Sequence, residues 1–186
     1  YCGPFRAAGL PEPFDLPPGD DRPLVYCSLG TLQGSRIGLF RKVAAACHAL
    51  DLRLLITTGG QGRLRPEDLP GRPIVCDWVP QEAVLAQADM AVCHAGMNSV
   101  LDPLAAGLPM VLMPLAFEQG AVAARAAHAG VARVVGARCS VRALTEAIAE
   151  VRREPLYRQR AAILRTEIEA SGGAVRAADL IEAALT

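Results

Sequence analysis

The 186-residue chain has no long apolar run and no excess of charge of either sign. Prolines and acidic residues interrupt its most apolar stretch, residues 90–129, so no segment reaches the roughly 20 apolar residues that span a bilayer. Residues 1–19, rich in proline and glycine, do not resemble a secretory signal. The 19 Lys and Arg residues balance the 19 Asp and Glu residues, and no basic stripe occurs. We therefore expect no transmembrane segment and no nucleic-acid partner.

Several cofactor motifs are missing as well. Neither GxGxxG nor GxxxxGK[ST] occurs, and Gly59, Gly60 and Gly62 form only a glycine-rich turn, which disfavours a nicotinamide dehydrogenase and a P-loop NTPase. There is no DxD, because Asp20 and Asp21 are adjacent and precede the predicted domain. We expect neither a metal ion nor a cofactor.

The six cysteines include no CxxC pair, and three of them lie in apolar runs typical of strands: Cys27, Cys76 and Cys93. This spacing offers no zinc site and favours buried free thiols. Free thiols are typical of a reducing compartment, so we predict a cytoplasmic protein.

From residue 23 onwards, short apolar runs alternate with longer amphipathic runs, which predicts an α/β domain with a Rossmann-like parallel sheet of about six strands flanked by helices. Residues 1–22 contain five prolines and are predicted to be an extended linker. The predicted strands are 24–28, 53–57, 74–78, 90–93, 110–113 and 132–135. The predicted helices are 37–50, 81–86, 100–106, 120–129, 141–152, 156–170 and 174–185.

Ligands of open parallel sheets bind beyond the carboxyl ends of the strands, which here selects four loops. These loops are residues 28–31, 78–81, 94–99 and 114–119. In the third of them, Gly96 lets the backbone approach an anion, and Asn98, Ser99 and His94 can hydrogen-bond phosphate oxygens near a helix start. The alternative is that Ser99 only caps the helix, with Asp102 completing a capping box.

Trp78 is the only tryptophan of the chain and is predicted to end a strand just before Pro80. A lone tryptophan of this kind is more often part of a core. Next to a diphosphate loop, however, its indole offers a stacking surface for a nucleobase, so the two features together suggest a nucleotide site.

Taken in order, the four loops resemble the donor-binding signature of the UDP-glycosyltransferase superfamily, whose members have the GT-B fold, with the closest likeness to bacterial carotenoid (zeaxanthin) glucosyltransferases. The resemblance implies that this chain is the C-terminal, donor-binding lobe (residues 23–186), that residues 1–22 connect it to an N-terminal lobe, and that a UDP-sugar binds as substrate. The residues that carry it are Ser28, Gly30, Thr31, Trp78, Val79, Gln81, His94, Gly96, Met97, Asn98, Ser99, Asp102, Glu118 and Gln119.

The resemblance also implies a role for each of these positions. Trp78 would stack on uracil while the Val79 backbone reads its edge, and Gln81 with Asp102 would bind the ribose. The diphosphate would be held by Thr31, His94 and residues 96–99. Glu118 and Gln119 would hydrogen-bond the sugar hydroxyls.

Three positions depart from the family pattern: Met97 for Trp, Asp102 for Glu and Glu118 for Asp. Asp102 is one methylene shorter than Glu and could serve the capping box instead. Glu118 changes the reach of the carboxylate to the sugar, so the identity of the sugar is left open. The general base of such enzymes belongs to the N-terminal lobe, and His48 and His128 are interpreted as ordinary helix residues. We expect no catalytic residue in this chain and no activity of the chain alone.

The main hypothesis is therefore the donor half of an inverting, metal-independent glycosyltransferase that uses UDP-glucose or a close relative. Its acceptor would be a hydroxyl of a small hydrophobic molecule, with a carotenoid as the family-level choice, and such an acceptor could draw the intact enzyme to a membrane surface. One alternative is a stand-alone nucleotide-sugar-binding subunit that works with a separate catalytic chain. A nucleotide-sugar epimerase would need acid and base residues that are not found.

Overall fold

The computed structural model describes residues 2–5, 12–17, 21–61 and 63–185. Six parallel strands form one sheet: β1 (Leu24–Ser28), β2 (Arg53–Thr57), β3 (Ile74–Cys76), β4 (Met90–Cys93), β5 (Met110–Leu112) and β6 (Ala132–Val134). The helices are α1 (Ile37–Ala49), α2 (Gln81–Leu85), α3 (Met97–Ala105), α4 (Gln119–His128), α5 (Val141–Arg153), α6 (Pro155–Ala170) and α7 (Gly173–Leu185), with a 3₁₀ turn at Pro66–Asp68. The predicted fold class is confirmed.

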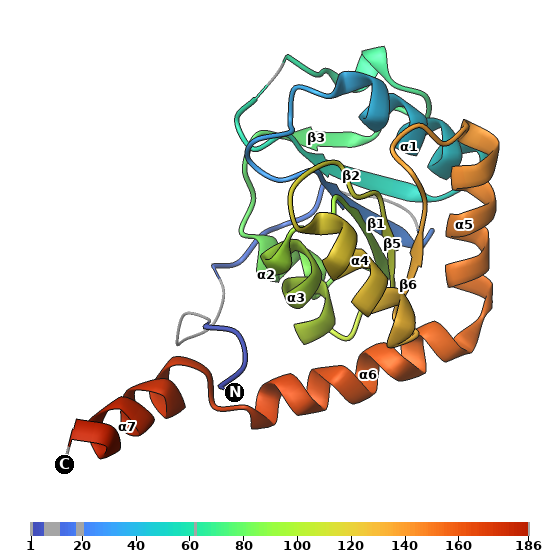
Figure 1. The fold of residues 1–186 in the computed structure, drawn as a ribbon. Helices are drawn as coiled ribbons and strands as arrows, with labels where there is room; N and C mark the ends of the chain where they lie inside the picture. Colours follow the sequence, from blue (N-terminus) through green and yellow to red (C-terminus); the bar gives the residue numbers. More distant parts are fainter. Residues whose placement is uncertain (1, 6–11, 18–20, 62, 186) are drawn as a thin grey trace.

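The strand order is β3-β2-β1-β4-β5-β6, so the direction of winding reverses between β1 and β4. Helices cover both faces of the sheet, with α1 and α5 on one face and α2, α3 and α4 on the other (Figure 1). Loops that follow neighbouring strands on either side of such a reversal diverge to opposite faces and leave a crevice between them.

Alternation along each strand gives the molecule two hydrophobic cores. In β1, Val25 and Cys27 pack with α1 and α5, whereas Leu24 and Tyr26 pack with α2, α3 and α4. Successive side chains of a strand point to opposite faces, and both faces are covered here, so most side chains of the strands are apolar.

Three cysteines of the sheet were predicted to be buried free thiols, and two of the three are buried. Cys27 and Cys93 are buried, and burial raises the pKa of the Cys93 thiol to about 12. Cys76 is only half-buried because β3 lies at the edge of the sheet. All six cysteines are free.

Two predicted element boundaries are wrong in ways that affect the site. The third strand ends at Cys76 rather than Trp78, and its last pair with β2 is Cys76 with Thr57. Helix α3 begins at Met97, three residues before the predicted start. The other boundaries agree with the predicted ones or differ from them by one residue.

Residues 12–17 of the predicted linker lie against the domain. Phe14 and Leu16 are partly buried against the core beside α2, and Gln87 donates to the Phe14 carbonyl at 3.0 Å. Arg53 donates to the Pro17 carbonyl at 3.2 Å. Residues 1, 6–11 and 18–20 of the predicted linker fall outside the described residues, and its interlobe role stays a prediction.

Candidate functional site

A hollow of about 420 Å³ lies at the carboxyl edge of the sheet, on both sides of the reversal between β1 and β4. Three of the four predicted loops contribute to it. Its lining residues are Tyr26, Ser28, Gly30, Thr31, Thr57, Gly59, Asp77, Trp78, Val79, Gln81, His94, Gly96, Met97, Asn98 and Ser99. Most predicted site residues are therefore brought together in one place.

The first turn of α3 faces this hollow. Gly96 precedes the helix with extended backbone angles, and the backbone N–H groups of Met97, Asn98 and Ser99 have no intrahelical acceptor because they open the helix. Such a helix start carries partial positive charge and accommodates anions. The capping-box alternative is wrong: Ser99 lies inside the first turn, and the Asp102 carboxylate accepts a hydrogen bond from Gln81 instead.

His94 lies between two glycines that leave room for its ring. A Cβ at Gly30 would come within 2.7 Å of His94 Cε1, and one at Gly96 within 2.6 Å of Nε2. Gly30 also has φ +75°, which favours glycine. The Ser99 hydroxyl lies 3.4 Å from His94 Nδ1. Desolvation lowers the pKa of His94, while the Ser28 backbone and the Glu118 carboxylate oppose the shift, so the ring is neutral at neutral pH.

Trp78 lies in the loop after β3, with 66% of its surface exposed. The start of this loop is tied to the residues that follow β2: the Asp77 carboxylate accepts from the Thr58 hydroxyl at 2.8 Å, and the Asp77 carbonyl accepts from the Gly59 N–H at 3.0 Å. The indole is close to Gly60, where a Cβ would lie 3.0 Å from Nε1. Trp78 is thus an exposed aromatic on the wall of the hollow that His94 and Ser99 also line, and the core alternative for it is wrong.

Four side chains at or beside the hollow are linked in series by hydrogen bonds, and only two of them were predicted from the sequence. The Tyr26 hydroxyl contacts Thr57 Oγ1 at 3.0 Å and donates to Gln81 Oε1 at 2.8 Å, and Gln81 Nε2 donates to Asp102 Oδ2 at 2.6 Å. Gln81 and Asp102 were predicted to act together; Tyr26 and Thr57 were not singled out. The available signal was that two polar side chains lie in or at the end of otherwise apolar strands.

A second hollow, of about 200 Å³, adjoins the first and shares Thr31, His94 and Gly96 with it. Leu32, Phe117, Glu118 and Gln119 also line it. The predicted sugar-binding residues therefore line a hollow that borders the first one at His94 and that Trp78 does not line.

The two predicted sugar ligands differ in accessibility. Glu118 is exposed, whereas Gln119 is only 5% exposed and its Oε1 accepts from the backbone N–H groups of Leu115 and Ala116 at 2.8 and 3.0 Å. That amide oxygen holds the loop after β5. Of the predicted pair, Glu118 is the side chain with a carboxylate accessible to a ligand.

Two backbone positions in these loops lie in the left-handed region without being glycine. Ala95 has φ +64° and Phe117 has φ +55°, next to His94 and Glu118 respectively. Such conformations cost on the order of 1 kcal/mol or more and persist where surrounding structure enforces them. Ala95 is fully buried, so core packing fixes the turn that directs His94 and Gly96 to the same hollow.

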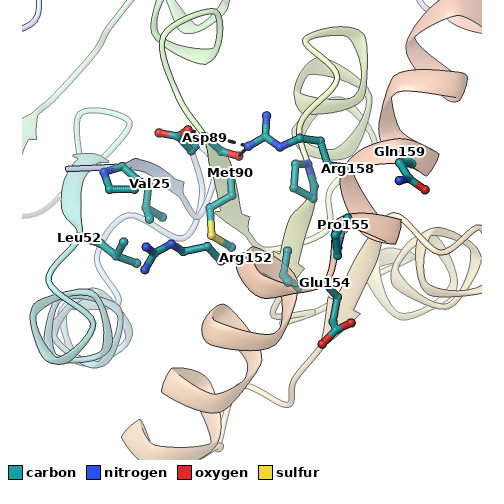
Figure 2. A pocket seen from close by; sticks show the side chains of 12 residues that line it. Val25, Leu52, Asp89, Met90, Arg152, Glu154, Pro155, Arg158 and Gln159 are labelled. Atoms are coloured by element: carbon teal, nitrogen blue, oxygen red, sulfur yellow. Dashed lines mark hydrogen bonds and ion pairs between the residues drawn. The ribbon is translucent and has the colours of Figure 1, made fainter. Parts of the chain in front are cut away.

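A larger hollow, of about 520 Å³, lies at the opposite, amino edge of the sheet under the α5–α6 junction (Figure 2). There Arg158 donates to the Asp89 carbonyl at 2.6 Å, and the Asp89 carboxylate accepts from the Leu24 N–H at 2.8 Å. These contacts fasten α6 to the sheet. No predicted site residue lies there, and ligands of such sheets bind at the other edge.

The described residues offer neither a cluster of metal ligands nor a helix that could cross a membrane. No group of three or more His, Cys, Asp or Glu side chains in the described part of the chain is arranged to hold a metal ion. No helix among those residues is both long and apolar enough to cross a bilayer.

Solved structures with the same architecture define the class of protein. The glycosyltransferase of kitacinnamycin matches 98% of this chain and 48% of its own, with 33% identity and a TM-score of 0.86. The calicheamicin glycosyltransferase CalG4 matches 98% of this chain and 47% of its own, with 30% identity and a TM-score of 0.83. The fold is that of the C-terminal lobe of a GT-B glycosyltransferase.

Sequence relatives narrow the class to a family. Residues 14–168 match the family model "UDP-glucoronosyl and UDP-glucosyl transferase". A zeaxanthin glucosyltransferase of Pseudescherichia vulneris is 37% identical over 188 residues, covering 100% of this chain and 45% of that protein. A demethyllactenocin mycarosyltransferase of Streptomyces fradiae is 34% identical, covering 91% of this chain and 37% of that protein. The chain belongs to the UDP-glucoronosyl and UDP-glucosyl transferase family, and it spans less than half the length of these relatives.

Proposed function

We propose that this chain is the donor-binding lobe of an inverting, metal-independent glycosyltransferase that transfers glucose from UDP-glucose to a hydroxyl of a small hydrophobic acceptor. Family membership supports sugar transfer in general. The zeaxanthin glucosyltransferase relative supports glucose and a carotenoid as the first donor sugar and acceptor to test.

The observation that carries the proposal is that an exposed indole and a helix start line one hollow. Trp78 offers a flat surface for uracil, and the N–H groups of Met97, Asn98 and Ser99 offer donors for the diphosphate. The adjoining hollow with Glu118 lies beyond His94 and suits the sugar. Base, diphosphate and sugar then follow one another from Trp78 to His94 to Glu118.

The contribution of this lobe to the reaction would be electrostatic. As the bond from the anomeric carbon to the diphosphate breaks, negative charge gathers on the leaving oxygen. The start of α3 and His94 are held in place before the reaction, so their dipoles stabilise that charge without reorganising. This arrangement supports leaving-group departure without a metal ion.

The acceptor and the general base would come from a second lobe to which residues 1–22 lead. His48 and His128 are exposed on α1 and α4, and neither lines either hollow of the site. This supports a base contributed from outside the chain. We further propose a cytoplasmic enzyme that contacts a membrane surface when it takes up a lipid-like acceptor.

Trp78 allows a direct test, because it is the only tryptophan of the chain and its fluorescence reports on stacking. We expect UDP and UDP-glucose to quench this fluorescence and to stabilise the fold by about 2.7 kcal/mol at 100 times the dissociation constant, and NAD to do neither. Thermal unfolding and calorimetric titration measure the second effect.

Two variants complete the test. Trp78→Phe keeps a smaller aromatic surface and should bind UDP more tightly than Trp78→Ala, which should lose about 1–3 kcal/mol of affinity. A response to NAD without a response to UDP, or equal affinity of Trp78→Ala and wild type for UDP, would contradict the proposal.

A further inference from the structure

The donor and the acceptor in each hydrogen bond that links Thr57, Tyr26, Gln81 and Asp102 can be deduced from the Asp102 carboxylate. Asp102, when ionised, can only accept, so the Gln81 group that faces it at 2.6 Å is the amide nitrogen. The Gln81 oxygen therefore faces Tyr26, whose hydroxyl must donate to it at 2.8 Å. Since Tyr26 has one hydroxyl proton, the Thr57 hydroxyl at 3.0 Å donates to the Tyr26 oxygen.

Tyr26 is held in place by the core. It lies in β1 with 3% of its surface exposed, and its ring packs in the core with α2, α3 and α4. Burial raises the pKa of Tyr26 to about 12, with hydrogen bonds from Thr57 and Ser28 opposing the rise, so the hydroxyl keeps its proton. A rigid, permanent donor thus faces an amide on the short helix α2.

The amide has no comparable restraint of its own. Gln81 is the first residue of α2, it is partly exposed, and it reaches the hollow on a side chain with three rotatable bonds. Its two hydrogen bonds, to Tyr26 and to Asp102, fix both the position of the side chain and which end of the amide faces each partner.

We infer that Tyr26 is a positioning residue for ribose recognition: its hydroxyl sets the orientation of the Gln81 amide and, through it, the Asp102 carboxylate, so that the pair discriminates in favour of a ligand with ribose hydroxyls. This inference rests on the proposed function, since that assigns Gln81 and Asp102 to the ribose. Tyr26 itself acts through Gln81 and need not touch the ribose.

The test compares UDP with 2′,3′-dideoxyuridine diphosphate, which keeps the base and the diphosphate and lacks both ribose hydroxyls. Calorimetric titration of wild type should show tighter binding of UDP. Tyr26→Phe, which removes one oxygen atom, should bind UDP about 3- to 10-fold more weakly, the effect of one hydrogen bond, and should bind the dideoxy ligand as wild type does.

The matched control is Tyr157→Phe. Tyr157 lies in the first turn of α6, donates to Glu150 at 2.6 Å and lies outside the site, so the same atom is removed from another hydrogen-bonded tyrosine. It should leave both affinities unchanged. A role of Tyr26 in the fold alone would instead weaken both ligands equally in Tyr26→Phe, and this result would overturn the inference.

Thr57→Val carries the same test if Tyr26→Phe does not fold. It removes the bond that steadies the tyrosine oxygen and leaves the Tyr26 donor in place, so a smaller loss confined to UDP supports the inference, and an equal loss for both ligands overturns it. If wild type binds UDP and both variants keep its full affinity, the inference about Tyr26 is wrong and the proposed function stands. Wild type that does not bind UDP overturns the proposed function as well.

Discussion

At the scale of single residues, the charge of His94 is the property of the site most sensitive to its surroundings. Half-burial among Gly30, Gly96 and Ser99 favours the neutral ring. A diphosphate placed on the start of α3 would add two negative charges next to the ring and favour its protonated form. The ligand and the proton should therefore bind cooperatively.

We predict that the affinity for UDP-glucose rises as the pH falls. The pKa of free His94 is lowered from 6.5, and the bound diphosphate raises it. Between these two values the complex binds more protons than the free protein, so affinity increases with acidity in this window and levels off on either side. UDP-glucose suits the experiment because its diphosphate does not titrate near neutral pH.

Calorimetric titration in buffers of different ionisation enthalpy measures the proton uptake directly. His94→Gln keeps a polar side chain that does not titrate and should abolish both the uptake and the pH dependence. An affinity of wild type that is independent of pH across the window would show that His94 does not contact the diphosphate.

At the scale of elements, the start of α3 needs a glycine at position 96 because a side chain there would collide with His94, and not because of the backbone angles. Gly96 has φ −63°, which any residue adopts, but a Cβ there would lie 2.6 Å from His94 Nε2. We predict that Gly96→Ala displaces the imidazole and weakens UDP-glucose binding by roughly 10-fold, which equals about 1.4 kcal/mol. Titration of the purified variant measures the loss.

Gly38 in the first turn of α1 is the matched control. A Cβ there meets no atom within 4 Å, so Gly38→Ala should leave affinity unchanged and raise the free energy of unfolding by about 0.5 kcal/mol through the better helix propensity of alanine. Chemical denaturation measures this gain. Full UDP-glucose affinity in Gly96→Ala would mean that His94 can move without consequence.

Helix α3 contains a proline, and a cysteine side chain replaces the backbone hydrogen bond that the proline cannot make. Pro103 lies inside the helix and has no N–H to donate to the Ser99 carbonyl four residues earlier. The buried Cys93 thiol donates to that carbonyl instead, at 3.1 Å. The first turn of α3, which faces the site, is in this way attached to the end of β4.

At the scale of the whole molecule, α7 stands apart from the two cores. It extends away from the body of the sheet and its helices (Figure 1), and none of its described side chains is buried. Helix α6, by contrast, buries Ala161 and packs Leu164 and Ile168 against the core. The last two helices therefore contribute differently to stability.

We predict that removing residues 173–186 lowers the free energy of unfolding of this chain by less than about 1 kcal/mol, since no buried apolar side chain is lost, and leaves UDP affinity unchanged. Removing residues 155–186 also deletes α6 and the Arg158 contacts with Asp89, and should prevent stable folding. Denaturation and UDP titration of both truncations distinguish these outcomes. A large loss of stability from the first truncation would contradict the prediction.

The order of elements and most of the site loops could be read from the sequence because both depend on local patterns. Apolar runs of four or five residues separated by helical periods indicate the fold class. The position of residues 28–31, 78–81 and 94–99 after predicted strands indicates the site loops. The end of β3 and the start of α3 could not be read, because the pairing of β3 with β2 and the buried turn at Ala95 depend on contacts between segments that are far apart in the sequence.

The sequence by itself determined that this chain forms a parallel α/β domain with the donor-site signature of a glycosyltransferase family, because strand and helix periods and loop motifs are properties of neighbouring residues. Only the tertiary structure decided which side chains meet. Tyr26 and Asp102 are 76 positions apart in the chain, and they are joined through Gln81 because β1, α2 and α3 converge at one edge of the sheet. Gln119 turned inward for the same kind of reason: the loop after β5 left two backbone N–H groups that its amide oxygen could satisfy.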